Sequence, residues 1–86
     1  MVTGYENICA ICGKPDVEIH HLVFGRGLRE LADADSLTIP LCRECHKAVH
    51  LNGTASALSK MLGQVWYEKN VGDRESFRKR YGRSYL

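Results

Sequence analysis

The chain has 86 residues, of which 44% are apolar and 26% are charged. A chain of this length forms a single domain, residues 1–86, whose core alone leaves it marginally stable, so we expect a metal or a disulfide to reinforce it. No apolar run is long enough to cross a membrane. The first residues, "MVTGYENICAIC", carry no secretory signal, so we expect an intracellular protein in which structural disulfides are disfavoured.

The net charge of +2 hides an uneven distribution along the chain. Residues 74–83 hold five basic residues and one acidic residue, whereas residues 1–73 hold seven basic and nine acidic residues. A basic C-terminal segment suits a polyanionic partner, although a charged helix face is more often simply solvated.

The first half of the chain is typical of a turn, two strands and a helix. "VEIHHLVF" is rich in β-branched and aromatic residues, and "SLTIPL" predicts a second strand whose end Pro40 places at a sheet edge. The expected order is a knuckle and turn at 9–16, a strand at 17–24, a loop with one loose turn at 25–35, a strand at 36–41, and a helix at 43–51 that ends at Asn52 and Gly53.

Two more helices are expected in the second half, which completes a small α+β fold. Thr54 is the predicted cap of a helix that runs to about residue 70. Asp73 is the predicted cap of a third, basic helix that ends near Gly82. The apolar residues of the longer helix repeat with the helical period and are expected to cover the core: Ala57, Leu58, Met61, Leu62, Val65 and Trp66.

The four cysteines form two Cys-x-x-Cys pairs, Cys9 with Cys12 and Cys42 with Cys45, separated by 29 residues. Two such pairs can give four thiolates to one tetrahedral zinc ion, which has no open position and is therefore structural. In zinc-finger peptides such an ion contributes roughly 10–16 kcal/mol to folding. Two disulfides or a redox dithiol are the competing interpretation.

Two of the four histidines, His46 and His50, lie four residues apart and therefore on one face of the expected helix. Cys45 and His46 are adjacent, so they point about 100° apart around that helix and favour two separate ions. His20 and His21 point to opposite faces of a strand, so only one of them is expected to join the helical pair. Three ligands leave positions open for water and substrate, as in catalytic sites.

Interpretations of the histidines without a metal ion stay open. Histidines four apart on an exposed helix are often coincidental, and a strand histidine is often a hydrogen-bonded core residue. Alternatively, Cys42 with His46 or His50 completes the zinc site without Cys45.

Residues 9–51, with CxxC, then "HH", then "PLCRECHKAVH", resemble the HNH endonucleases, in particular small phage-type members with a four-cysteine zinc knuckle. The resemblance implies a zinc-stapled ββα-metal, treble-clef-like motif, here followed by a helical basic extension at 54–86. It implies a metal-dependent DNA endonuclease or nickase that hydrolyses phosphodiesters and leaves 5′-phosphate and 3′-hydroxyl ends.

Position by position, the resemblance assigns His21 as general base, and an imidazole of ordinary pKa, about 6.5, can accept a proton near neutral pH. The middle Asn of the family, which braces the loop under the base, has no counterpart, and Asp35 or Ser36 is the candidate substitute. The implied ligands are His20, His46 and His50 for the catalytic ion, and Cys9, Cys12, Cys42 and Cys45 for structural Zn2+.

The same residues narrow the choice of catalytic ion and indicate the partner. Three imidazoles suit Zn2+, Ni2+, Mn2+ or Co2+ better than Mg2+, whereas family members often use Mg2+ or Mn2+, so the ion stays open. In the C-terminal helix we expect Phe77 and Tyr81 to dock the helix, and Arg78, Lys79 and Arg83 to contact phosphates of DNA. Nothing resembles a base-reading element, so weak sequence preference is expected, with neither a membrane nor a small molecule as partner.

The runner-up is a noncatalytic treble-clef zinc module that binds nucleic acid or protein, and a third interpretation is an HNH relic that has lost activity. The histidines separate the first two, because a binding module does not need His21 beside a three-histidine site.

Overall fold

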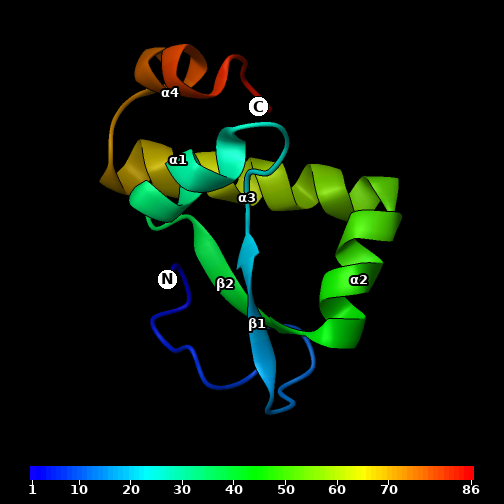
Figure 1. Ribbon diagram of the computed structural model, residues 1–86. Helices are drawn as coiled ribbons and strands as arrows, with labels where there is room; N and C mark the ends of the chain where they lie inside the picture. Colours follow the sequence, from blue (N-terminus) through cyan, green and yellow to red (C-terminus); the bar gives the residue numbers. More distant parts are fainter.

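The computed structural model describes residues 1–86 and shows a small α+β fold with a two-stranded sheet and four helices, as expected (Figure 1). Strand β1 (Val17–His21) pairs antiparallel with β2 (Thr38–Cys42), so that His20 lies opposite Ile39. The helices are α1 (Leu28–Ala34), α2 (Arg43–Leu51), α3 (Gly53–Asn70) and α4 (Arg74–Tyr81). None of them has both the length and the apolar character that a membrane crossing requires.

Helix α1 lies where a loop was predicted, so the prediction for 25–35 was wrong. The helix begins after Gly27, whose φ of 76° is in the left-handed region, and it has no side-chain cap. It buries Ala32 completely, and Leu28 and Leu31 pack against the same core. A helix this short is stabilised by packing more than by local propensity, which is why the sequence pattern does not indicate it.

The first strand is shorter than predicted, because Leu22 and Val23 leave the sheet and enter the core, where both are fully buried. The Leu22 backbone N–H still donates to the Leu37 carbonyl, at 2.9 Å, and so extends the pairing by one bond. The second strand is displaced to 38–42, whereas the helix at 43–51 and the end of α3 near residue 70 are confirmed.

Helix α3 turns the opposite face to the core from the one that its apolar pattern predicts. It buries Ser59, Gly63, Gln64 and Tyr67, while Leu58 is 57% exposed. Of the six residues expected to cover the core, only Trp66 packs partly against it, and the others are exposed: Ala57, Leu58, Met61, Leu62 and Val65.

The reason for this orientation is close backbone packing at Gly63. A methyl group at this position would lie 2.8 Å from Val23 Cγ2 and 3.1 Å from Leu22 Cβ. Small residues thus let α3 approach the segment that follows β1. The cap of α3 is Asn52, whose side chain accepts from the Ala55 N–H at 2.9 Å, and not Thr54 as predicted.

Helix α4 has the predicted caps, since Asp73 and Ser76 form a capping box and Gly82 ends the helix with φ 87°. Phe77 and Tyr81 are buried and stack at 4.5 Å, so the prediction that these aromatics dock the helix is confirmed. Figure 1 shows α4 on the far side of α1 and α3 from the sheet, with α2 connecting the sheet to α3.

Candidate metal centres and cleft

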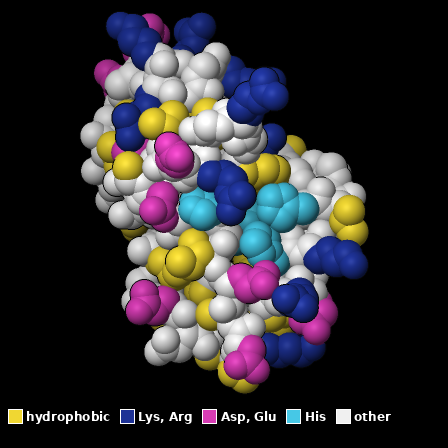
Figure 2. Space-filling view, in the orientation of Figure 1, with side chains coloured by type: hydrophobic (Ala, Val, Ile, Leu, Met, Phe, Trp, Pro, Cys, Tyr) yellow, Lys and Arg dark blue, Asp and Glu magenta, His cyan; other side chains and the backbone are white.

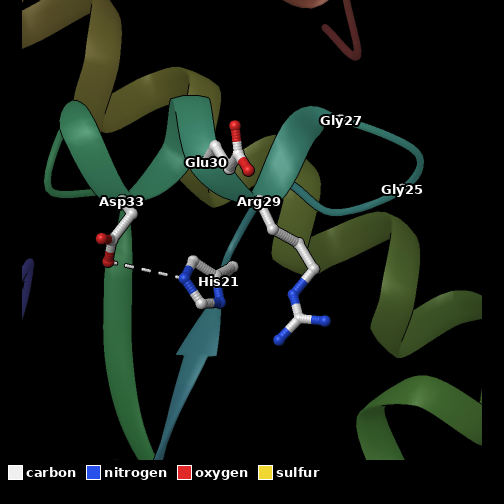
Figure 3. Close-up of a pocket in the computed structure, with 6 residues that line it drawn as sticks. All are labelled: His21, Gly25, Gly27, Arg29, Glu30 and Asp33. Atoms are coloured by element: carbon white, nitrogen blue, oxygen red, sulfur yellow. Dashed lines mark ion pairs between the residues drawn. The ribbon is translucent and has the colours of Figure 1, made fainter.

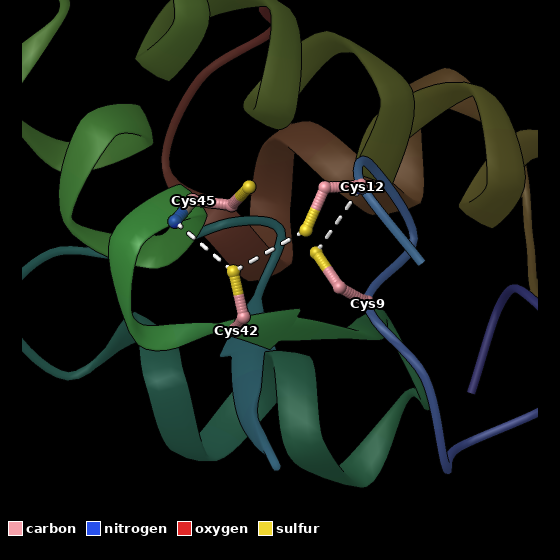
Figure 4. Close-up of side chains that lie close together, drawn as sticks. All are labelled: Cys9, Cys12, Cys42 and Cys45. Atoms are coloured by element: carbon pink, nitrogen blue, oxygen red, sulfur yellow. Dashed lines mark hydrogen bonds between the residues drawn. The ribbon is translucent and has the colours of Figure 1, made fainter. Parts of the chain in front are cut away.

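The four cysteines converge on one point beside the end of the sheet (Figure 4). Their sulfur atoms all lie within 4.8 Å of one another, and Cys12 Sγ is 3.5 Å from Cys42 Sγ. Tetrahedral zinc with Zn–S bonds of about 2.3 Å requires sulfur separations of about 3.8 Å. The cluster therefore fits a structural metal such as zinc, and no disulfide is present.

Local backbone geometry prepares these thiols as ligands. Burial alone raises the pKa of Cys9, but hydrogen bonds from backbone N–H groups, including those of Cys12 and Ile11, lower it to about 6. Cys42 is at once the last residue of β2 and the N-cap of α2, and its sulfur accepts from the Cys45 N–H at 3.5 Å. The hydrogen bond with Cys42, and then burial, raise the pKa of Cys45 to about 12, so in the absence of an ion the cluster keeps protons on some of its thiols. The knuckle and the helix start thus present their sulfur atoms to the same point.

A second cluster is formed by His20 of β1 and by His46 and His50 of α2. One ring nitrogen from each lies within 4.8 Å of the others, and the ring centroids are 5.0–5.3 Å apart. Cys45 and His46, although adjacent in sequence, belong to different clusters. The structure thus separates the two sets of donors as the helical geometry predicts.

Hydrogen bonding fixes the tautomer of His20. Ser59 Oγ donates its proton to the Leu22 carbonyl at 2.8 Å, so it must accept from His20 Nε2–H, also at 2.8 Å. This leaves His20 Nδ1 with a lone pair, and it is the one buried side-chain polar atom that has no hydrogen-bond partner. An unpartnered buried nitrogen that faces two other imidazoles fits a metal ligand.

Glu18 orients His46 in the same way. His46 Nδ1 donates to Glu18 Oε1 at 2.9 Å, which leaves its Nε2 for an ion. This hydrogen bond holds the pKa of Glu18 below its usual range. A carboxylate behind a ligating histidine is a common support for metal ligands.

Two imidazoles of the cluster, those of His20 and His50, have a lowered pKa, which favours the neutral form that binds metal. Burial, and then the nearby His46 and His50, lower the pKa of His20 to about 3. The pKa of His50 is also lowered, mainly by burial and to a smaller extent by the nearby charges of His46 and Arg29.

His21 lies beside this cluster without being part of it. Its Nε2 is 3.5 Å from Asp33 Oδ1 on α1, and its other ring nitrogen points away from Asp33 toward the side where Arg29 lies (Figure 3). A cavity of about 310 Å³ is lined by His21 together with His46 and His50. An adjoining cavity of about 450 Å³ continues past His21 along α1. The fourth histidine and two members of the cluster, His46 and His50, thus line one cleft, whereas His20 is buried behind them.

The two candidate braces lie elsewhere. Asp35 accepts hydrogen bonds from Arg80 Nε and the Tyr81 hydroxyl, both at 2.6 Å, so its carboxylate anchors α4 instead of the loop under His21. Ser36 has φ 59° and makes no side-chain hydrogen bond. The carboxylate that does reach His21 is Asp33, which the sequence did not single out.

The expected phosphate-contacting residues are distributed over the end of the chain. Arg78 pairs loosely with Glu75 at 3.7 Å, Lys79 has no acidic partner, and the Arg83 guanidinium lies 5.2 Å from the Tyr85 ring. Lys60 of α3 was missed: its Nζ is 4.7 Å from the ring of Phe24, which in turn is 4.5 Å from the ring of His50. No sequence signal marks Lys60, because only the fold brings it beside Phe24, which lines the cleft.

Taken together, these features define a small α+β protein with four clustered cysteines that could hold a metal ion, and with a cleft beside a second cluster of three histidines. A family described as "Protein of unknown function (DUF968)" matches residues 5–74, most of the chain, and the protein belongs to this family. No curated protein and no solved structure matches the chain.

Proposed function

We propose that the protein is a metal-dependent DNA endonuclease or nickase of the HNH type, with a structural zinc ion on its cysteines. The observation that carries the proposal is the cleft that His21 lines together with His46 and His50, two of the three clustered histidines that could hold an ion. The arrangement of β1, β2 and α2 around the histidines also supports a ββα-metal site.

Phosphodiester hydrolysis needs a base that takes a proton from the attacking water, and positive charge near the phosphoryl oxygens. His20, His46 and His50 would hold a divalent ion, which would supply that charge as a Lewis acid. His21 is the proposed base: Asp33 lies against Nε2, so Nδ1 is the nitrogen that takes the proton. The carboxylate then stabilises the imidazolium that forms, as in other histidine–carboxylate pairs.

The DNA backbone is proposed to pass the basic residues near the cleft. Lys60 is linked to the histidine cluster through the Phe24 ring, and Lys60 and Arg83 line one cavity of about 520 Å³ together with Tyr85. Unpaired cations beside aromatic rings suit phosphate contact without base reading.

The test is cleavage of supercoiled plasmid by protein of known zinc content, with Mg2+, Mn2+, Ni2+, Co2+, Zn2+ or EDTA. We expect metal-dependent nicking that His21→Ala slows by about 10²–10⁴-fold with unchanged DNA affinity, since this is the usual contribution of a general base. Lys47→Ala is the matched control, because Lys47 is exposed on α2 between the two ligands and lies outside the cleft. A protein that holds its zinc and binds DNA but cuts under none of these ions would instead be a binding module.

A further inference from the structure

Helix α1 brings two residues of opposite charge to the two sides of His21. Arg29 and Asp33 are four residues apart and therefore on one face of the helix. Figure 3 shows the Asp33 carboxylate against one ring nitrogen of His21, and the Arg29 side chain extending on the other side of the ring. The helix thus places an acid behind the proposed base and a cation in front of it.

The guanidinium of Arg29 has no polar partner within the protein. Arg74 pairs with Glu68, and Arg80 is held by Asp35, whereas Arg29 forms no ion pair or side-chain hydrogen bond. The Arg29 side chain is exposed, and it forms no ion pair with Glu30, the acidic residue next to it in the sequence. Five donor N–H groups are therefore free for a ligand.

Arg29 faces the same cleft as the histidines. It lines the cavity of about 310 Å³ together with His21, His46 and His50, and also lines the adjoining cavity of about 450 Å³. Figure 2 shows a basic side chain lying between the histidine surfaces on this face of the molecule. No carboxylate lines the smaller cavity, whereas Glu30 and Asp33 both line the adjoining one. An anion beside Arg29 therefore meets least negative charge on the side of the histidines.

We propose that Arg29 contacts the phosphoryl group of the substrate at the histidine cluster. The assignment rests on the proposed nuclease function and adds to it the residue that binds the nonbridging oxygens. A guanidinium binds two phosphoryl oxygens at once through a planar fork, and it stays charged at every pH at which a nuclease works. Its positive charge also stabilises the negative charge that develops on those oxygens as water attacks.

Phosphate binding tests the assignment without DNA cleavage. The probe is inorganic phosphate, titrated against protein with zinc on the cysteines and Co2+ on the histidines, with the visible spectrum of Co2+ as the readout. We expect Arg29→Ala to weaken the apparent phosphate affinity about tenfold, and Arg29→Lys to weaken it less, since lysine keeps the charge but not the fork. Arg26→Ala is the matched control, because Arg26 is an exposed arginine three residues earlier that lines neither cavity.

Plasmid cleavage under single-turnover conditions gives the second readout for the same variants. We expect Arg29→Ala to reduce the cleavage rate about 10²-fold, as for loss of one oxyanion donor, and to change DNA affinity less than threefold. Wild-type phosphate affinity and cleavage rate in Arg29→Ala would overturn the assignment, as would equal losses in Arg26→Ala. Phosphate binding that depends on Arg29 in a protein that cuts no DNA would support the phosphate contact and overturn the nuclease proposal.

Discussion

Ser59 shows how a residue outside every motif can decide the chemistry of a motif residue. Its hydroxyl accepts from His20 Nε2 and donates to the Leu22 carbonyl, so one buried side chain on α3 sets which nitrogen of His20 is free. Replacement of Ser59 would leave both the imidazole N–H and the carbonyl without a partner.

We therefore expect Ser59→Ala to weaken metal binding at the histidines about 10–100-fold, as is usual when a supporting hydrogen bond of a ligand is lost. It should also lower the free energy of unfolding by about 1–3 kcal/mol. Ser56→Ala is the control, because Ser56 also donates to a backbone carbonyl, that of Val49, but does not touch a histidine. Competition titrations with a metal-binding dye measure the affinities, and equal losses in both variants would contradict the role of Ser59.

The depressed pKa of His20, about 3, makes a second prediction, for protein whose histidines hold no metal. Below about pH 6.5 the unfolded chain takes up a proton at His20, whereas the native chain does not. The free energy of unfolding therefore has its full value above this pH and falls as the pH is lowered. At pH 5 the loss from this residue is about 2 kcal/mol. Urea unfolding at pH 6.5 and pH 5 should show a smaller difference in His20→Gln than in the wild type, and equal differences would refute the prediction.

The sequence indicated the histidines and cysteines because their spacing is local: two ligands one helical turn apart, and two pairs with two residues between the cysteines. It did not indicate Arg29, Asp33 or Ser59, since their roles depend on contacts between elements. His21 and Asp33, for example, are twelve residues apart, and their contact requires a helix that the sequence pattern does not reveal.

Among the elements, α3 departs most from what its sequence predicts. A stripe of apolar residues at helical spacing normally faces the core. Here close approach to Leu22 and Val23 requires a residue without a side chain, and Gly63 is the position of α3 that meets this requirement. Close packing at one glycine therefore outweighs the burial of several leucine-sized side chains.

Gly63→Ala is accordingly expected to lower the free energy of unfolding by about 1–3 kcal/mol through overpacking. This loss should exceed the gain of about 1 kcal/mol that alanine brings to a helix. Gly53→Ala is the matched control: it lies at the start of the same helix, and an added methyl group would meet nothing within 4 Å. Denaturant titrations of both variants measure the difference, and a Gly63→Ala protein at least as stable as Gly53→Ala would contradict this explanation.

At the scale of the whole molecule, the cysteine cluster joins two segments that are distant in sequence, the turn with Cys9 and Cys12 and the junction of β2 with α2. It lies in a core of its own with Leu41 and Val49, apart from the larger core around Phe77. The segment with Cys9 and Cys12 contains no helix or strand, and the cluster holds it against α2. A metal ion here would contribute on the order of 10 kcal/mol, comparable to the entire stability of a small domain.

We expect the wild-type protein to bind two metal ions per chain, and removal of zinc by a chelator to abolish cooperative thermal unfolding. Cys12→Ser should bind at most one ion and should unfold at a much lower temperature. His46→Ala is the control, since it should lose the histidine-bound ion but keep both zinc and the folded state. Mass spectrometry under native conditions counts the ions, and circular dichroism follows unfolding. A metal-free chain that unfolds at the wild-type temperature would contradict the structural role of the ion.

Helix α2 carries residues of both candidate metal clusters, and this has a consequence for how the chain would take up metal. Cys42 and Cys45 fix the start of the helix and its rotation about its own axis, and the same nine-residue helix sets where His46 and His50 point. An ion on the cysteines therefore preorganises two of the three histidines, so the zinc site is expected to fill first. Because coupling between two binding sites is reciprocal, an ion on the histidines must tighten zinc binding by the same factor.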